Sequence, residues 1–267
     1  MSRKLFVKLH LNNKLRYKLA MRILLLVIYL LLIVVLAIVA LVVMGLATLL
    51  SLPFDGERKM VLALSRPVAR LVYLLSPLWR VRVEGEEKID PTKRYVITAN
   101  HQSFFDIPLF FFLPIWKFKF VSKIEVRKIP AIGWMLGMRG DIVIRRGTAS
   151  AATTLMEEGA EHLQAGTSVA IFPEGTRTKN CEVHRFKEGA FRLAQDNGVA
   201  VLPCVMEGTS GLFSIRGLAT RELRLRVLTP ISAEEVAQTP TKELAKRVEE
   251  MTREALAEIR ASQSKEK

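Results

Sequence analysis

The chain has 267 residues, enough for one sizeable domain and an additional segment at a usual domain size of roughly 100–200 residues. Its mean hydropathy is +0.22, and 40 Lys and Arg residues against 26 Asp and Glu residues give a net charge of +14, which suits an anionic membrane or an anionic substrate. Zinc-finger spacing, aromatic RNA-binding signatures and metal-spaced Cys or His residues are missing from the sequence, so we expect neither a nucleic-acid partner nor a metal.

The N-terminal third predicts attachment to a membrane. Residues 1–22 contain several basic residues and no acidic residue, and the uncharged apolar run Ile23–Leu50 follows them. As one helix this run would be about 42 Å long, which exceeds the roughly 30 Å of a bilayer core. A cleaved signal peptide has an apolar core of only about 7–15 residues, so we favour a helix that stays in the membrane.

A second apolar stretch, Met60–Trp79, follows a short polar break. Arg66 and Arg70 lie about one helical turn apart within it and would form a cationic stripe on one helix face. This pattern fits a helix at the lipid interface whose arginines face phosphate groups. It fits almost as well an amphipathic helix that packs against the following domain, so both interpretations stay open.

From residue 81 onward, short β-rich runs alternate with longer helical runs, which predicts an α/β fold with a central, mostly parallel sheet flanked by helices. We expect residues 1–80 to form membrane helices, residues 81–232 the α/β domain, and residues 233–267 a C-terminal helix. The expected strands are Tyr95–Ala99, Phe118–Ser122, Ile142–Ile144, Val169–Phe172, Val199–Val205 and Leu223–Leu228, and the expected helices are Ser150–Ala165, Gly189–Asn197 and Thr239–Ala261.

Two polar elements follow predicted strands. His101 and Asp106 come after the first strand and are five residues apart, so their side chains can meet only if the chain turns between them. Ser103 or Asp106 could cap a helix that starts there. The second element, Phe172–Thr178, has a Gly and a Thr that can offer N–H groups and a hydroxyl to an anion, and an Arg suited to a phosphate. Each element by itself is also compatible with an ordinary polar pair or turn.

Together these elements resemble the glycerolipid acyltransferase family, whose members carry N-H-x-x-x-x-D and F-P-E-G-T-R in this order. Further family blocks match at Lys123–Gly133, at Phe186–Ala190 and at Val201–Pro203, and the resemblance covers roughly residues 81–228. The block that begins at Lys123 is followed by a strand ending at Arg146. Close relatives often have Asp at the preceding position, which is Arg145 here, so either arginine could face the substrate.

The resemblance implies a 1-acylglycerol-3-phosphate O-acyltransferase of phospholipid biosynthesis. Such an enzyme moves a fatty acyl group from acyl-CoA or acyl carrier protein to the sn-2 hydroxyl of lysophosphatidic acid, makes phosphatidic acid, and needs no cofactor. An alcohol is a poor nucleophile at neutral pH, and His101 suits the role of general base, with Asp106 accepting its other ring N–H. We expect direct transfer without an acyl-enzyme intermediate. If such an intermediate formed, Ser103 and Cys204 would be the candidate nucleophiles.

The remaining site residues are those implied by the matching blocks. Three cations would hold the phosphate of the acceptor, and a carboxylate would orient one of them or a glycerol hydroxyl. Backbone N–H groups of two further residues would stabilise the developing oxyanion. Aromatic residues between positions 104 and 116 could line an acyl channel, although core packing is the better expectation for most of them. The three phosphate-holding cations are Lys123, Arg146 and Arg177, and the orienting carboxylate is Glu174. The two backbone N–H donors to the oxyanion are those of Gly175 and Thr176.

The location of the domain follows from charge and from the donor. The positive-inside rule places the basic N-terminus in the cytoplasm, and a thioester donor is cytosolic. A single crossing would send the domain outside, so we expect a hairpin-like or re-entrant helix pair that returns it to the cytoplasmic face, at the plasma membrane if the protein is bacterial.

Other functions stay open. The acceptor could be another lysophospholipid or an acylated amino acid. The chain could also be a hydrolase, but no G-x-S-x-G nucleophile elbow is present. A non-catalytic lipid-binding membrane protein would need neither His101 nor Asp106, so their presence argues against that alternative.

Overall fold

The computed structural model describes residues 3–145, 147–178, 180–212 and 220–265. Within these residues the strands form one seven-stranded sheet in the order β1-β7-β6-β2-β5-β3-β4. The strands from β6 to β4 are parallel to one another, β7 is antiparallel to β6, and β1 is parallel to β7. The strands are β1 Trp79–Glu84, β2 Tyr95–Ala99, β3 Phe118–Lys123, β4 Ile142–Ile144, β5 Ser168–Ile171, β6 Ala200–Glu207 and β7 Arg221–Val227.

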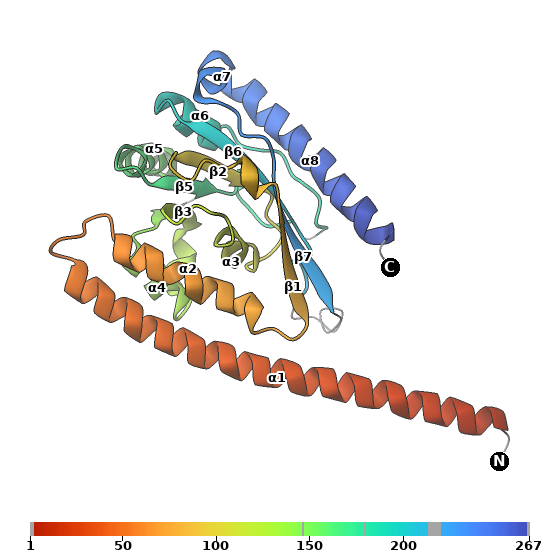
Figure 1. Cartoon of the computed structure of the whole chain (residues 1–267). Helices are drawn as coiled ribbons and strands as arrows, with labels where there is room; N and C mark the ends of the chain where they lie inside the picture. The colour runs from red at the N-terminus through yellow and green to blue at the C-terminus, as the bar shows by residue number, and fades with distance from the viewer. Residues whose placement is uncertain (1–2, 146, 179, 213–219, 266–267) are drawn as a thin grey trace.

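Helices cover both faces of this sheet (Figure 1). The N-terminal helices and α3 lie on one face, and α5 to α8 lie on the other. The predicted α/β fold with a mostly parallel sheet is therefore confirmed. The helices are α1 Arg3–Ser51, α2 Lys59–Leu74, η1 Glu86–Lys88, α3 Asp106–Phe110, η2 Ile124–Lys128, α4 Ile132–Arg139, α5 Ala149–Gln164, α6 Gly189–Asp196, α7 Ala233–Gln238 and α8 Thr241–Lys265.

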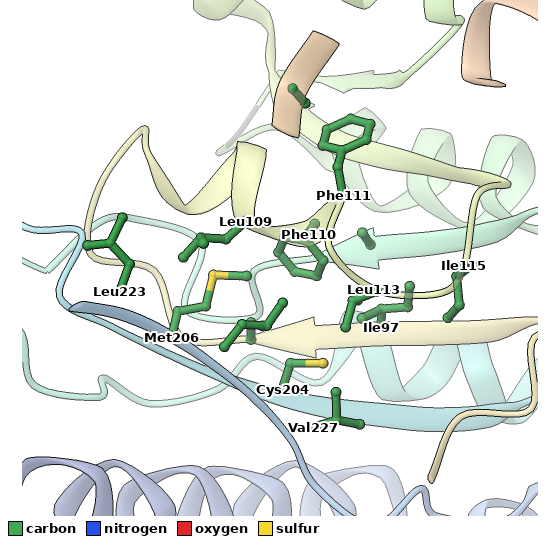
Figure 2. Close-up of a cluster of buried hydrophobic side chains, with 14 of the residues drawn as sticks. Ile97, Leu109, Phe110, Phe111, Leu113, Ile115, Cys204, Met206, Leu223 and Val227 are labelled. Carbon is green, nitrogen blue, oxygen red and sulfur yellow. The ribbon is translucent and has the colours of Figure 1, made fainter. Parts of the chain in front are cut away.

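The central strands are apolar on both faces because each face carries a hydrophobic core. Ile97 of β2 belongs to the core under α1, α2 and α3, whereas Val96 belongs to the core under α5, α6 and α8. Figure 2 shows the first core, in which Phe110 lies over the side chains of β2 and β6, whereas the Phe111 ring packs against Phe118 and Phe120 of β3. The Phe110 and Phe111 rings are almost fully buried, so they pack in the core, as expected for most of that aromatic stretch.

The sequence analysis missed several short elements. The strand β1 alternates polar and apolar residues, but it begins at the last residue of the apolar stretch Met60–Trp79, which hides its start in the sequence. The helices α3 and α4 have five and eight residues, too few to show a helical period in the sequence. The proposed domain boundaries at residues 80 and 232 stay predictions.

The first two helices form a hairpin. By length and composition, residues 16–51 of α1 could cross a membrane, and most of this segment is exposed. One narrow stripe of α1 is buried against the rest of the chain, and it includes Tyr29, Ala40, Met44 and Ala47. The Tyr29 hydroxyl donates to the carbonyl oxygen of Val72 in α2 at 2.6 Å. Figure 1 shows α1 lying along α2, with its N-terminal part extending past β1.

The arginines of α2 do not face lipid phosphates. Arg66 donates to the carbonyl oxygens of Phe111 and Leu113, and Arg70 donates to those of Phe111 and Phe112. These carbonyl groups lie in the segment directly after α3 and need donors from outside it. The structure therefore contradicts the phosphate-facing interpretation and supports an amphipathic helix that packs on the domain.

The turn between η2 and α4 depends on Gly133. A Cβ at this residue would stand 2.0 Å from the carbonyl oxygen of Arg127, so the two backbone segments are in direct contact. The Gly133 N–H donates to the Ile129 carbonyl oxygen at 2.8 Å. Because Gly133 has no side chain, η2 can lie against α4. The segment η2 begins directly after Lys123.

We expect Gly133→Ala to lower the free energy of unfolding by about 3 kcal/mol, because the new methyl group must push backbone atoms apart. Gly137→Ala in the same helix is the matched control, because a Cβ there meets nothing within 4 Å. The control should be neutral or slightly stabilising, since Ala is the better helix former. Thermal unfolding in detergent compares the two variants, and equal melting temperatures would contradict the assignment.

Candidate active site

The strand order brings the predicted site residues to one edge of the sheet. The strands β2, β5, β3 and β4 are neighbours and parallel, so their carboxyl ends meet at the same edge. His101 follows β2, the loop Pro173–Thr178 follows β5, and Lys123 ends β3. Neighbouring strands are about 4.8 Å apart, so Lys123 starts about 10 Å from His101 along the edge. Arg145 follows β4, whereas Arg146 lies outside the described residues.

His101 and Asp106 form a pair. The His101 Nδ1 atom lies 2.8 Å from the Asp106 Oδ2 atom, because the chain turns between β2 and α3 and brings the two side chains together. Asp106 is fully buried, and the side chain of His101 is 11% exposed. The imidazole ring stacks on Phe172 with a centroid distance of 3.9 Å. The Asp106 carboxylate therefore fixes the ring through Nδ1 and leaves Nε2 for a reacting proton.

The Asp106 carboxylate is held on both oxygens. Oδ2 also accepts the backbone N–H groups of Gln102 at 2.7 Å and Ser103 at 2.8 Å. Oδ1 accepts the hydroxyl of Thr209, a buried residue 103 positions along the chain, at 2.5 Å. The sequence analysis did not find Thr209, because a lone threonine in a turn after β6 gives no sequence signal. Its hydroxyl fixes the rotation of the carboxylate and so the direction in which the imidazole ring is held.

Removing only the Thr209 hydroxyl tests this role. We expect Thr209→Val to lower kcat about tenfold with little change in KM, and Thr209→Ser, which keeps the hydroxyl, to restore most of the loss. Thr252→Val is the matched control, because Thr252 is equally buried but its hydroxyl bonds the Val248 carbonyl oxygen within α8. Activity of Thr209→Val within twofold of wild type would rule the role out.

Glu174 braces the loop and does not pair with Arg177. Its Oε1 atom accepts the His101 backbone N–H at 2.9 Å, and its Oε2 atom accepts that of His184 at 3.3 Å. The suggested pairing of Glu174 with Arg177 is therefore wrong, since a buried carboxylate satisfies nearby backbone donors first. Arg177 instead lies over the Phe104 ring, with its guanidinium carbon 3.9 Å from the ring centroid.

Burial raises the pKa of the Glu174 carboxyl to about 7, although the two N–H donors act in the opposite direction. The folded protein holds the Glu174 proton more tightly than the unfolded chain does. The contribution of this proton to folding stability is therefore fully present below pH 4.5 and is lost as the pH rises through about 7. Relative to Glu174→Gln, wild type should lose about 2 kcal/mol of stability between pH 4.5 and pH 8. Unfolding in detergent at both pH values measures this. Glu243→Gln on the surface of α8 is the control, and an equal pH dependence in both variants would contradict the shift.

The two proposed oxyanion donors differ. The Gly175 N–H donates to the Phe172 carbonyl oxygen at 3.0 Å, so the turn itself uses this donor. Thr176 is exposed beside it. The structure also places Lys187 here, with its ammonium nitrogen 2.9 Å from where a Cβ of Gly175 would stand. The F-K-x-G-A block contained this lysine, but its position over the loop could not be seen in the sequence.

Neither candidate nucleophile is suitably placed. Cys204 is fully buried in β6, and burial raises the pKa of its thiol well above the ordinary value. The Ser103 hydroxyl accepts the backbone N–H of Phe105 at 3.2 Å and so supports the turn into α3. Direct transfer thus remains the better prediction. Within the described ranges, no group of three or more His, Cys, Asp or Glu residues is placed to hold a metal.

The end of β6 and helix α8 support the loop around His101. The Gln102 side-chain amide donates to the Met206 carbonyl oxygen at 3.2 Å and to Glu207 at 3.1 Å. Arg260 of α8 donates to the same Glu207 oxygen at 3.1 Å and forms an ion pair with Glu182 at 3.1 Å. This network connects α8 to the loop that carries His101 and to the segment that carries Glu182.

Residues 80–207 match the model of the family described as Acyltransferase. This match identifies an acyltransferase domain that covers just under half of the chain. Among solved structures, the chain is similar to PlsC, the 1-acyl-sn-glycerophosphate acyltransferase of Thermotoga maritima, with a TM-score of 0.69 and 28% identity, over 88% of this chain and 97% of that one.

Two curated members of the acyltransferase family share 38% identity with the chain. One is a 1-acyl-sn-glycerol-3-phosphate acyltransferase of Chlamydomonas reinhardtii, matched over 51% of this chain and 41% of its own length. The other is a lyso-ornithine lipid O-acyltransferase of Pseudomonas aeruginosa, matched over 47% and 46%. The chain thus spans less than half the length of these two relatives.

Proposed function

We propose that this protein transfers a fatty acyl group from a thioester donor to the sn-2 hydroxyl of lysophosphatidic acid and so makes phosphatidic acid. The observation that carries the proposal is the contact of 2.8 Å between His101 Nδ1 and Asp106 Oδ2, at a sheet edge that also carries Lys123 and Arg177. The names of the Chlamydomonas and Thermotoga relatives support the same acceptor.

In the proposed reaction the acceptor hydroxyl attacks the thioester carbonyl carbon. Nε2 of His101 takes the hydroxyl proton as the C–O bond forms, and Asp106 stabilises the resulting imidazolium. The tetrahedral intermediate collapses, the C–S bond breaks, and the leaving thiolate takes the proton from His101. Atoms and protons balance without an acyl-enzyme and without a cofactor.

The acceptor phosphate would bind the cations that line the same edge. Arg177 lies in the loop after β5, Lys187 lies beside Gly175 of that loop, Lys123 ends the neighbouring strand β3, and Arg146 is proposed with them from the family pattern. Flexible ammonium groups and the planar guanidinium suit a phosphate dianion. The backbone N–H of Thr176 is the proposed oxyanion donor.

We further propose that α1 lies in one leaflet of the membrane rather than across it. From Tyr29 to Ala47 its buried stripe faces the rest of the chain over about 27 Å, nearly the full thickness of a bilayer core. A helix crossing perpendicular to the membrane would carry α2 and α4 into the hydrocarbon with it. Lying along the membrane surface, α1 leaves the domain on the cytoplasmic side.

Reporter fusions at the two chain ends test this topology. A helix embedded in one leaflet predicts that both ends report the cytoplasm. An external report from either fusion would contradict the embedded arrangement and favour a crossing helix.

Acyl transfer in membranes that contain the wild-type protein tests the function. Labelled acyl-CoA and labelled acyl carrier protein are compared as donors, with lysophosphatidic acid as acceptor. We expect phosphatidic acid from at least one donor, and the faster donor identifies the thioester partner. Lyso-ornithine lipid is the second acceptor to test, because of the Pseudomonas relative. Transfer to that acceptor alone would replace the proposed substrate.

A further inference from the structure

The helix α4 exposes apolar side chains beside the predicted phosphate site. Trp134 is 63% exposed and Ile132 is 40% exposed, and Arg127 and Lys128 of η2 lie exposed just before them. These four residues are called the α4 surface below. A large aromatic residue next to basic residues is the composition found where proteins meet the headgroup region of a membrane.

The backbone holds the α4 surface in one orientation. The direct contact of Gly133 with the Arg127 backbone fixes η2 against α4. Ala131, between them, has a φ of 65°, a left-handed conformation that costs a non-glycine residue energy. This strained residue directly precedes α4, whose first turn carries the exposed Ile132 and Trp134.

Residues of α4 that neighbour Ile132 and Trp134 on the helix surface pack on the membrane hairpin. Met135 and Met138 pack against a small core formed by Met44 and Ala47 of α1 and Val61 of α2. The α4 surface is therefore continuous with the helix that is long and apolar enough to enter a membrane. This continuity and the positive charge of Arg127 and Lys128 distinguish a lipid bilayer from other occupants.

We propose that the α4 surface inserts into the headgroup region of an anionic lipid bilayer and seats the mouth of the active site on the membrane. The inference rests on the proposed function, because an active site held at the bilayer serves an enzyme whose acceptor is a membrane lipid. Lys123 immediately precedes η2, so the insertion of Trp134 sets this cation at the level of lipid phosphates. The lysolipid then reaches His101 without leaving the bilayer.

Fluorescence quenching of the full-length protein in vesicles tests the insertion. The vesicles contain phosphatidylglycerol and phosphatidylcholine, with or without bromine on the acyl chains. Trp116→Phe leaves Trp79 and Trp134, whereas the double variant Trp116→Phe with Trp134→Phe leaves only the buried Trp79. We expect brominated lipid to reduce the emission assigned to Trp134 about twofold and to leave that of Trp79 almost unchanged.

A kinetic comparison separates seating from chemistry. Trp134→Ser should raise the KM for lysophosphatidic acid in vesicles about fivefold, because less of the enzyme engages the surface. Its kcat and KM for a short-chain, water-soluble acceptor should match wild type. Trp116→Ser is the matched control, since Trp116 is 40% exposed but lies just before β3, at the opposite end of that strand.

Each outcome decides the inference. Emission from Trp134 that is equal in brominated and plain vesicles overturns it, and so does a dimer in which a second copy shields Trp134 from lipid. An equal effect of Trp116→Ser and Trp134→Ser on vesicle kinetics also overturns it. Failure of wild type to acylate either acceptor would instead remove the proposed function, while the quenching result would still decide whether the α4 surface enters lipid.

Discussion

His101→Ala should reduce acyl transfer by about 10³-fold at saturating substrates, with little effect on folding. In the proposed reaction, His101 Nε2 is the basic atom that the His101–Asp106 pair offers to the acceptor hydroxyl, because Nδ1 is hydrogen-bonded to Asp106. Without it the hydroxyl must lose its proton to water, although bound substrates remain aligned. Transfer of labelled acyl groups by purified protein in detergent, at matched protein concentration, measures the loss.

His162→Ala is the matched control for this experiment. His162 lies at the end of α5, with its Nδ1 atom 3.5 Å from Glu57 in the turn after α1, at the opposite edge of the sheet from His101. Its loss should leave kcat within about twofold of wild type, because this half-buried residue lies away from the site. If His101→Ala retained a tenth or more of the activity, another base would have to be found.

Asp106→Asn should lower kcat about 10³-fold and yet leave the melting temperature within a few degrees of wild type. The amide oxygen can take the place of Oδ2 and accept the N–H groups of His101, Gln102 and Ser103. The amide nitrogen can then donate to the Thr209 oxygen, because a hydroxyl also accepts. The three N–H groups keep their acceptor and Thr209 keeps one hydrogen bond, but the charge that stabilises the imidazolium is gone.

Asp106→Ala separates the structural role from the electrostatic one. It leaves the N–H groups of Gln102 and Ser103 without their acceptor in a buried turn, which should cost on the order of 3 kcal/mol of stability. Melting temperature and kcat measured together distinguish the two variants. Equal destabilisation by Asn and Ala would show that the charge of Asp106 supports the fold rather than the reaction.

The comparison of sequence and structure is clearest around His101. The motif contained the residues of the pair, but only the turn from β2 into α3 shows that their side chains meet at 2.8 Å. For Glu174 the motif contained the residue, but of the two suggested partners Arg177 lies over Phe104 instead, and a glycerol hydroxyl stays a prediction. The two Glu174 oxygens accept backbone N–H groups from segments 73 and 10 positions away, and no local pattern records such contacts.

For the cationic side chains, too, the sequence indicated the residues and the fold decided their partners. The spacing of Arg66 and Arg70 correctly placed them on one helix face, but their acceptors are carbonyl groups more than 40 residues away. Arg177 lies over Phe104, and this contact depends on β2 and β5 being neighbours. Sequence spacing determines which side chains share a face, whereas the packing of elements determines what that face meets.

The sequence by itself determined the apolar N-terminal helix, the α/β alternation, most strands and the order of the catalytic blocks, because these depend on residues close together in the chain. The tertiary structure alone decided that Thr209 holds Asp106, that Arg260 reaches the loop around His101, and that α1 lies along the domain. Each of these depends on the order of strands in the sheet and on burial between distant segments. Hydrophobic periodicity predicts that a face will be buried but carries no information about which distant segment will cover it.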